Sequence, residues 1–316
     1  MTSTTWLLLA AFALDLCLGD PRWLPHPVRG FGRLVERLET QWRQAGRLLG
    51  LRLAGAGFAL TAIGGAVTIV WLTLRLASPW EWAAAAVTIY WIYSMLAVRD
   101  LDLEAGAVIA RVREGDLTGA RRLLRNIVGR DTENLDEPEI LRAVLETVAE
   151  NLNDAVVAPL FYFGLAGPAG MAAYKAANTL DSTAGYKNDR YREFGWASAR
   201  LDDLLNLAPA RISAALIWIA AGLAGLDLRR SVKAVWRDAA RQPSPNAGYP
   251  EAALAGALGL RLGGVNFYGG VAYPKPWLGE PVRPICAQCF QEARKVLYGS
   301  SALMVVAVVL ALEWTR

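Results

Sequence analysis

Charged and polar side chains are concentrated in one stretch of the chain, residues 174–211. It reads YKAANTLDSTAGYKNDRYREFGWASARLDDLLNLAPAR, and apolar segments precede and follow it. Lys, Arg, Asp and Glu alternate there with Asn, Ser, Thr and Gly. Phosphate handling needs this mixture, because Mg²⁺ takes oxygen ligands while phosphate oxygens take Lys, Arg or backbone N–H donors. The stretch therefore indicates a reaction site at a membrane surface.

A second polar segment, 130–154, carries Glu146, Glu150 and Asp154 at intervals of four residues. This spacing places the three carboxylates on one face of a helix. They could form a solvated stripe in which Arg142 pairs with Glu146, or a ladder of carboxylates that holds Mg²⁺. The spacing alone favours the solvated stripe.

A third polar segment, 243–270, is rich in glycine and also carries Asn246 and Tyr268. Its pairs Gly263-Gly264 and Gly269-Gly270 permit close approach of the backbone to a ligand, and they fit a plain turn connection equally well. Neither GxxxxGK[ST] nor GxGxxG occurs, so the chain has no standard nucleotide-binding loop.

Cysteine and histidine are scarce, with three cysteines and one histidine in 316 residues. A disulfide framework or a multi-histidine metal site cannot be built from so few. Cys286 and Cys289 have CxxC spacing, but no second pair exists, and the motif leads into an apolar helix. The pattern favours two small packing residues over a zinc or redox site.

The composition predicts a polytopic membrane protein. The chain is 54% hydrophobic yet 20% charged, and both kinds of residue fall in blocks, as apolar spans and polar loops do. The net charge of +4 is modest, and arginines beside apolar spans are what the positive-inside rule produces. Charge therefore gives no reason to expect a nucleic-acid partner.

We predict an all-α fold with about five to six apolar helices, some of them broken or re-entrant, in a single membrane domain over 1–316. The first apolar segment is expected to be a retained membrane segment rather than a cleaved signal peptide. The polar catalytic segments are 99–154, 174–203 and 227–295. The apolar segments are 6–18, 53–76, 80–98, 155–173, 204–226 and 296–312.

The topology of 155–226 has several solutions. Segment 155–173 is interrupted by Pro159, Gly167 and Pro168, so it is either a broken span or a re-entrant hairpin. The choice decides on which side of the membrane 174–203 emerges. A kinked or peripheral helix at 204–226, favoured by Pro209, would keep all polar loops together on the cytoplasmic side.

Four long blocks resemble the adenosylcobinamide-phosphate synthase family of cobalamin biosynthesis, the CbiB type. The resemblance covers nearly the whole chain, in order and at plausible spacings. It implies a membrane-bound, ATP-dependent carbon–nitrogen ligase that joins (R)-1-amino-2-propanol phosphate, or a related amino-alcohol, to adenosylcobyric acid and gives adenosylcobinamide phosphate. The blocks are GDPRWLPHPVRGFGRLVERLE, IVGRDTENLDEPEILRAVLETVAENLNDAVVAPLFY, AYKAANTLDSTAGYKNDRYREFGWASARLDDLLNLAPARI and PSPNAGYPEAALAGALGLRLGGVNFYGG.

With this resemblance the site residues become specific. It raises the carboxylate ladder to an equal alternative, and it implies ATP and Mg²⁺ as cofactors. The catalytic residues expected are Lys187, Asp181, Arg190 and Asp203. The substrate-binding and phosphate-binding residues expected are Asn178, Ser182, Tyr186, Asn188, Arg130, Asn151, Asn246, Gly264 and Tyr268. The metal ligands expected are Glu146, Glu150, Asp154 and Asp202.

The expected partners are the corrinoid substrate, aminopropanol phosphate and the lipid bilayer, with other late cobalamin-pathway membrane enzymes or a second copy of the chain as further candidates. The expected location is the inner (plasma) membrane, multi-pass, with the active site on the cytoplasmic face. Two other functions remain open at this stage, namely a non-catalytic membrane regulator or sensor of the same fold and a corrinoid transporter.

Overall fold

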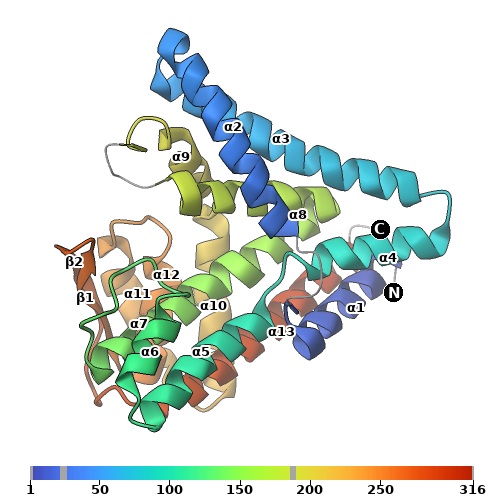
Figure 1. Ribbon diagram of the computed structural model, residues 1–316. Coiled ribbons are helices and arrows are strands. Elements are labelled where there is room, and N and C mark those ends of the chain that lie inside the picture. The colour runs from blue at the N-terminus through green and yellow to red at the C-terminus, as the bar shows by residue number, and fades with distance from the viewer. Residues whose placement is uncertain (1–2, 22–26, 186–189, 315–316) are drawn as a thin grey trace. The chain divides into compact units, whose positions relative to one another are not determined.

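The structure is a computed structural model that describes residues 3–21, 27–185 and 190–314. Nearly all of its regular structure is helical (Figure 1), and a single two-stranded sheet accompanies the helices in these ranges. The chain forms two compact units. Unit 1 comprises Met1–Ala97, Ala158–Asn206 and Ala307–Arg316, and unit 2 comprises Val98–Val157 and Leu207–Val306. The expectation of a single ligase domain stays a prediction, because two compact units can belong to one functional domain.

Within the described residues, four helical stretches are long and apolar enough to cross a membrane. A bent pair of helices, Trp196–Leu205 and Leu207–Leu223, adds a fifth candidate if the pair forms one span, and the bend measures 44°. This confirms the predicted all-α polytopic class. The four stretches are Leu51–Ala77, Glu81–Arg113, Glu137–Ala184 and Cys289–Trp314.

Unit 1 contains a pair of helices that lie side by side in Figure 1, the amphipathic α2 (Pro27–Leu49) and the apolar α3 (Leu51–Ala77). Its core includes Phe58, Leu180 and Phe194, all fully buried. A Cβ on Gly55 would overlap the Phe194 carbonyl oxygen, so glycine lets α3 come this close. The other helices are α1 (Ser3–Leu18), α4 (Glu81–Tyr93), α8 (Ala158–Ala184), α9 (Trp196–Leu205) and the C-terminal end of α13.

The break that the sequence predicts in 155–173 lies at Ala166 and Gly167. Both residues have non-helical backbone angles, with a φ of 62° at Gly167, and Pro168 follows. Glycine tolerates this positive φ, and proline removes a helical hydrogen bond, so the interruption of α8 has a local cause. The bend near 204–226 falls at Asn206, whereas Pro209 lies inside the first turn of α10 (Leu207–Leu223), where proline is tolerated.

Unit 2 contains a helix that begins with a strong start signal, α7 (Glu137–Leu152). The Asp136 side chain accepts from the backbone N–H of Glu139, and the Glu139 side chain accepts in return from the N–H of Asp136, which forms a capping box. A π-helical turn, η1 (Asn153–Val157), follows it. The other helices are α5 (Val98–Arg113), α6 (Leu117–Leu124), α10, α11 (Leu228–Asp238), η2 (Ala239–Arg241), α12 (Gly248–Leu258) and the first part of α13 (Cys289–Trp314).

The glycine-rich segment of unit 2 forms an antiparallel hairpin, β1 (Arg261–Tyr268) and β2 (Val271–Gly279), which the sequence analysis did not foresee. The register shifts between Leu262 and Gly264, and the φ values of Gly263 and Gly264 are 94° and 87°. These angles require glycine and produce a bulge rather than a disordered loop. The hairpin contacts α7, α11 and α12.

Candidate functional site

A small polar cavity in unit 2 gathers charged side chains from four parts of the chain. It has a volume of about 100 Å³ and lies among the loop before α7, α7 itself, α12 and the hairpin. Five of the residues predicted from the sequence line it, namely Arg130, Glu146, Glu150, Asn151 and Tyr268. The lining residues outside the predicted set include Glu251, Asn266 and Lys275.

A buried ion pair fixes one wall of this cavity. Arg130 Nη2 lies 2.5 Å from Glu146 Oε2, and both side chains are almost fully buried. Glu146 Oε1 accepts from the backbone N–H of Gly263 at 2.7 Å, and Arg130 also donates to the Asn266 side chain. The pair thereby ties the loop before α7, α7 and β1 together, which satisfies both charges without water.

The interpretation of the carboxylates as a solvated stripe is wrong for Glu146. That side chain is buried and pairs with Arg130, whereas Arg142 donates to the Val265 carbonyl oxygen at 3.3 Å and lies over the Trp277 ring. Residues four apart on a helix share a face, but tertiary packing decides what that face meets.

Two members of the predicted ladder share the cavity, while their role as Mg²⁺ ligands stays a prediction. Glu146 and Glu150 line the cavity, and the Glu150 side chain is exposed there. Asp154 lies in the π-helical turn, where it accepts from Asn153 Nδ2 at 2.7 Å, and it is outside the cavity lining.

Glu251 is the most unusual acid in the cavity. It is 1% exposed, and its Oε2 accepts from Gln242 Nε2 at 2.6 Å. Burial, followed by repulsion from Glu146 and Glu150, raises the pKa of Glu251 to about 8. The half-buried Lys275 lines the same cavity, and although burial opposes its charge, attraction to Glu251 and Glu150 raises its pKa. The cavity therefore combines a carboxyl group that titrates near neutral pH with a firmly charged ammonium.

The sequence contains a signal that could have identified Glu251 and Lys275 as site residues. Glu251 is the lone charged residue of an otherwise apolar helix, GYPEAALAGAL, and Lys275 stands between two prolines in YPKPW. An ionisable residue in an apolar helix needs a buried partner, which by itself suggests a site.

The structure describes no group of three or more His, Cys, Asp or Glu side chains placed to hold a metal ion among residues 3–21, 27–185 and 190–314. Glu146 is already engaged by Arg130 and Gly263. Mg²⁺ often binds through one or two carboxylates and takes its other ligands from phosphate and water. Glu150 fits that limited role, so the donor set suits an ion that arrives with a phosphate group rather than one held by protein alone.

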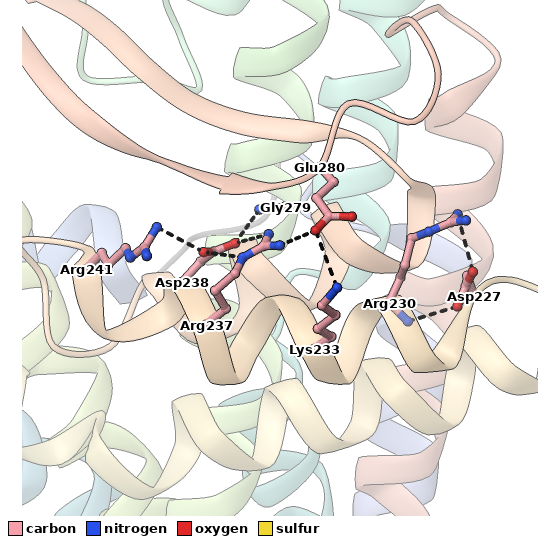
Figure 2. Close-up of polar contacts among 8 residues, drawn as sticks. All are labelled: Asp227, Arg230, Lys233, Arg237, Asp238, Arg241, Gly279 and Glu280. Atoms are coloured by element: carbon pink, nitrogen blue, oxygen red, sulfur yellow. Dashed lines mark hydrogen bonds and ion pairs between the residues drawn. The ribbon is translucent and has the colours of Figure 1, made fainter.

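A cluster of charged residues at the end of β2, which comprises Arg237, Asp238 and Glu280 and is called the clamp below, holds the strand that carries Lys275 (Figure 2). Arg237 at the end of α11 pairs with Asp238 through two contacts of 2.8 and 2.7 Å and also with Glu280. Asp238 accepts in turn from the backbone N–H of Gly279 at 2.9 Å. Burial opposes the charge of Asp238, but the bonds from Arg237 and Gly279 more than offset it and lower the pKa of Asp238.

Two predicted residues of unit 2 have structural partners outside the cavity. Asn246 is buried and accepts from Arg211 Nη1 at 3.2 Å. Gly264 lies in β1, where a Cβ would overlap the Trp277 ring and come within 2.8 Å of Arg142 Nη1. The glycine there permits close packing within the protein, and its predicted role as a phosphate-binding residue remains untested.

In unit 1 the structure brings Asn178 and Asp202 together. Asn178 Nδ2 donates to Asp202 Oδ1 at 3.2 Å, which joins α8 to α9. Asp181 lies on α8 and is half-buried, while Asp203 lies on α9, where its carboxylate is 3.8 Å from Arg200. The Asn178–Asp202 hydrogen bond thus links α8 to α9, whereas the Asp203–Arg200 pair lies within α9.

The remaining predicted residues lie near or beyond the end of α8. Ser182 donates to the Thr179 carbonyl oxygen at 3.0 Å, and the exposed Arg190 pairs with Glu39 at 3.0 Å. The predicted site residues Tyr186, Lys187 and Asn188 lie outside the described residues.

Fold and site together define the class of this protein as a polytopic helical membrane protein with a charged cavity. The family model described as CobD/Cbib protein matches residues 8–297. The chain therefore belongs to the CobD/CbiB family.

Curated relatives agree with this assignment. A protein named cobalamin biosynthesis protein CobD, from Geobacter metallireducens, is 45% identical over 97% of this chain and 96% of its own length. A cobalamin biosynthesis protein CbiB from Salmonella arizonae is 40% identical over 99% of this chain and 98% of its own length. No solved structure matches the chain.

Proposed function

We propose that the protein acts in cobalamin biosynthesis as an ATP-dependent ligase. It would form an amide between a carboxylate of adenosylcobyric acid and the amine of (R)-1-amino-2-propanol phosphate, or a related amino-alcohol, and so give adenosylcobinamide phosphate. Full-length matches to relatives named as cobalamin biosynthesis proteins support the pathway. The polar cavity of unit 2 is the observation that supports the chemistry.

The proposed reaction needs an activated carboxylate, because a carboxylate does not react with an amine at neutral pH. Transfer of the γ-phosphoryl group of ATP to the corrinoid carboxylate would give an acyl phosphate. The amine, after its ammonium form has given a proton to solvent, attacks the carbonyl carbon. The C–N bond forms, the bond from the carbonyl carbon to the phosphate oxygen breaks, and the nitrogen releases a second proton to the departing phosphate or to solvent. Negative charge develops on oxygen in both steps, so cations near those oxygens accelerate them.

The cavity is the proposed site for the amino-alcohol phosphate. Its volume of about 100 Å³ is below the 300–1,000 Å³ typical of pockets for larger ligands, which excludes a corrinoid but suits a small molecule. Arg130 and Lys275 supply positive charge for the phosphate, and Glu251 supplies a carboxyl group for the ammonium. A ligand with both charges matches a cavity that has both.

Mg²⁺ and ATP are part of the proposal. Glu150 of unit 2 is proposed to help place Mg²⁺, which would supply charge neutralisation for phosphate oxygens when bound. In unit 1, Asp202 is proposed as a metal ligand and Asp203 as a catalytic residue. Lys187 and Arg190 are proposed to neutralise phosphate oxygens. We also propose that the active site faces the cytoplasm, and labelling of a cysteine placed at position 187 by a reagent confined to the outside would rule this out.

Mass spectrometry of the corrinoid tests the function directly. The purified protein in nanodiscs is incubated with adenosylcobyric acid, ATP, Mg²⁺ and each amino-alcohol, phosphorylated or not. We expect one amide-linked product, and none when ATP is omitted or Mg²⁺ is chelated. An unchanged corrinoid that still binds would favour a regulator, whereas uptake into sealed vesicles without conversion would favour a transporter.

Single substitutions test the roles proposed for Lys187, Asp203 and Lys275. We expect Lys187→Ala and Asp203→Ala to reduce the ligation rate, and wild-type rates in both would refute their assignment. Lys275→Ala should raise the KM for the phosphorylated amino-alcohol more than that for its unphosphorylated form. Lys295→Ala, which removes an exposed lysine of α13, is the matched control and should change neither value.

A further inference from the structure

Two cysteines next to α13 lie within contact distance of one another. Cys286 Sγ is 3.4 Å from Cys289 Sγ, and both are free thiols in the structure. The backbone N–H of Cys289 donates to the carbonyl oxygen of Cys286 at 2.9 Å. This bond closes a four-residue turn, in which the first and last Cα atoms are less than about 7 Å apart. A disulfide bridges Cα atoms about 4.4–6.8 Å apart, so the backbone already suits one.

The two thiols have different surroundings. Cys289 is fully buried as the first residue of α13, whereas Cys286 is exposed. Small apolar packing explains Cys289 but leaves the exposed Cys286 without a role. The sequence alone favoured packing for both, and the structure supports it for one.

The surroundings of Cys286 favour its thiolate. Burial disfavours the charge, but hydrogen bonds from the Cys289 thiol and from the backbone N–H groups of Cys289 and Gln288 together more than offset it and lower the pKa of Cys286. Arg283 adds positive charge, and its guanidinium is held by the Leu258 carbonyl oxygen at 2.7 Å and by Glu292. An exposed thiolate beside a buried thiol is the arrangement of a dithiol that exchanges with disulfides.

We propose that Cys286 and Cys289 form a redox-active pair that closes to an intramolecular disulfide by exchange with a small-molecule disulfide such as oxidised glutathione. The Cys286 thiolate attacks one sulfur of the oxidant, a mixed disulfide forms, and one thiolate leaves. Cys289 then gives its proton to solvent, and its thiolate attacks Cys286 Sγ and releases the second thiolate. The two protein thiols are oxidised by two electrons, and the oxidant is reduced to two thiols.

The first test follows the sulfur atoms by mass spectrometry. Full-length protein carrying Cys17→Ser, reconstituted in nanodiscs, is treated with oxidised glutathione and then alkylated. We expect the parent protein to lose both thiols and retain no glutathione. Adding Cys289→Ser should trap one glutathione on Cys286, and adding Cys286→Ser instead should leave Cys289 unmodified.

Two results would overturn the proposal. If the Cys289→Ser protein takes up no glutathione, Cys286 is not the attacking thiol. If the parent protein retains glutathione to the same extent as Cys289→Ser, Cys289 does not complete the exchange.

A second test needs no substitution. The rate of alkylation of Cys286 by iodoacetamide is measured against pH in the native protein and in the same protein denatured in detergent. We expect the native midpoint at lower pH and a rate at pH 7 several-fold higher than in the denatured protein. Equal midpoints would show that the fold does not activate Cys286, and this result is independent of ligase activity.

Discussion

Glu251→Gln should stabilise the folded protein at neutral and alkaline pH. The pKa of Glu251 is about 8 in the folded state, against an ordinary value of 4.5 that it regains on unfolding. The two pKa values differ by roughly three and a half units. Each unit corresponds to about 1.36 kcal/mol, which gives a penalty on the order of 4–5 kcal/mol above pH 8. Glutamine has nearly the same shape and no charge, so it removes this penalty.

The sign of the pH dependence follows from proton binding. Below pH 4.5 Glu251 is protonated in both states and contributes no slope. Between pH 4.5 and about 8 the folded state binds more protons than the unfolded state, so stability falls as pH rises. Above pH 8 the contribution is constant.

Thermal unfolding in detergent checks this prediction. The midpoint Tm is measured at pH 5, 7 and 9 in metal-free buffer for the wild type and for Glu251→Gln. We expect the two values to converge at pH 5 and the variant to unfold at higher temperature at pH 9. Glu114→Gln, which removes an exposed carboxylate just after the end of α5, should follow the wild type. A constant difference between Glu251→Gln and the wild type over this range would refute the reasoning.

Two further predictions concern the hairpin. Asp238→Asn weakens the clamp on Gly279 and should lower the free energy of unfolding by about 1.5–3 kcal/mol. The pKa of Asp238 is lowered from 3.8 in the folded state, so this loss of stability should shrink as pH falls below 3.8. Hydrogen exchange of β2 should show faster opening in this variant, and unchanged exchange would contradict the clamp. Gly264→Ala should lower Tm more than Gly270→Ala, because both residues have positive φ but only the former would place a Cβ against Trp277. Equal losses of Tm would show that backbone strain alone matters.

The membrane spans could be predicted from the sequence because their signal is local. The apolar segments 53–76 and 296–312 lie within Leu51–Ala77 and Cys289–Trp314, and composition over about 20 residues decides such spans. The break in 155–173 was equally accessible, since Gly167 and Pro168 act on their own backbone.

The hairpin, and the proximity of Glu251 on α12 to Lys275 on β2, were beyond this kind of reasoning. Residues 261–279 lack the alternation of a half-buried strand, and the bulge at Gly263 and Gly264 explains why. Glu251 and Lys275 are 24 positions apart and belong to an apolar helix and a proline-rich strand. Their proximity depends on how α12 packs against the hairpin, which no local pattern encodes.

The charged groups that line the cavity can offset one another. With Glu146 and Glu150 counted as ionised and Glu251 as protonated, Arg130 and Lys275 balance the two carboxylates, and the formal charge of the five groups is zero. Ionisation of Glu251 would leave one negative charge in excess, and the fold resists it by raising the pKa of that residue. A ligand that brings an ammonium group beside Glu251 would restore the balance with the carboxylate charged. By this charge count the cavity can accept an ammonium group by releasing a single proton, whereas a phosphate group on the same ligand brings negative charge that needs a cation beyond these five groups.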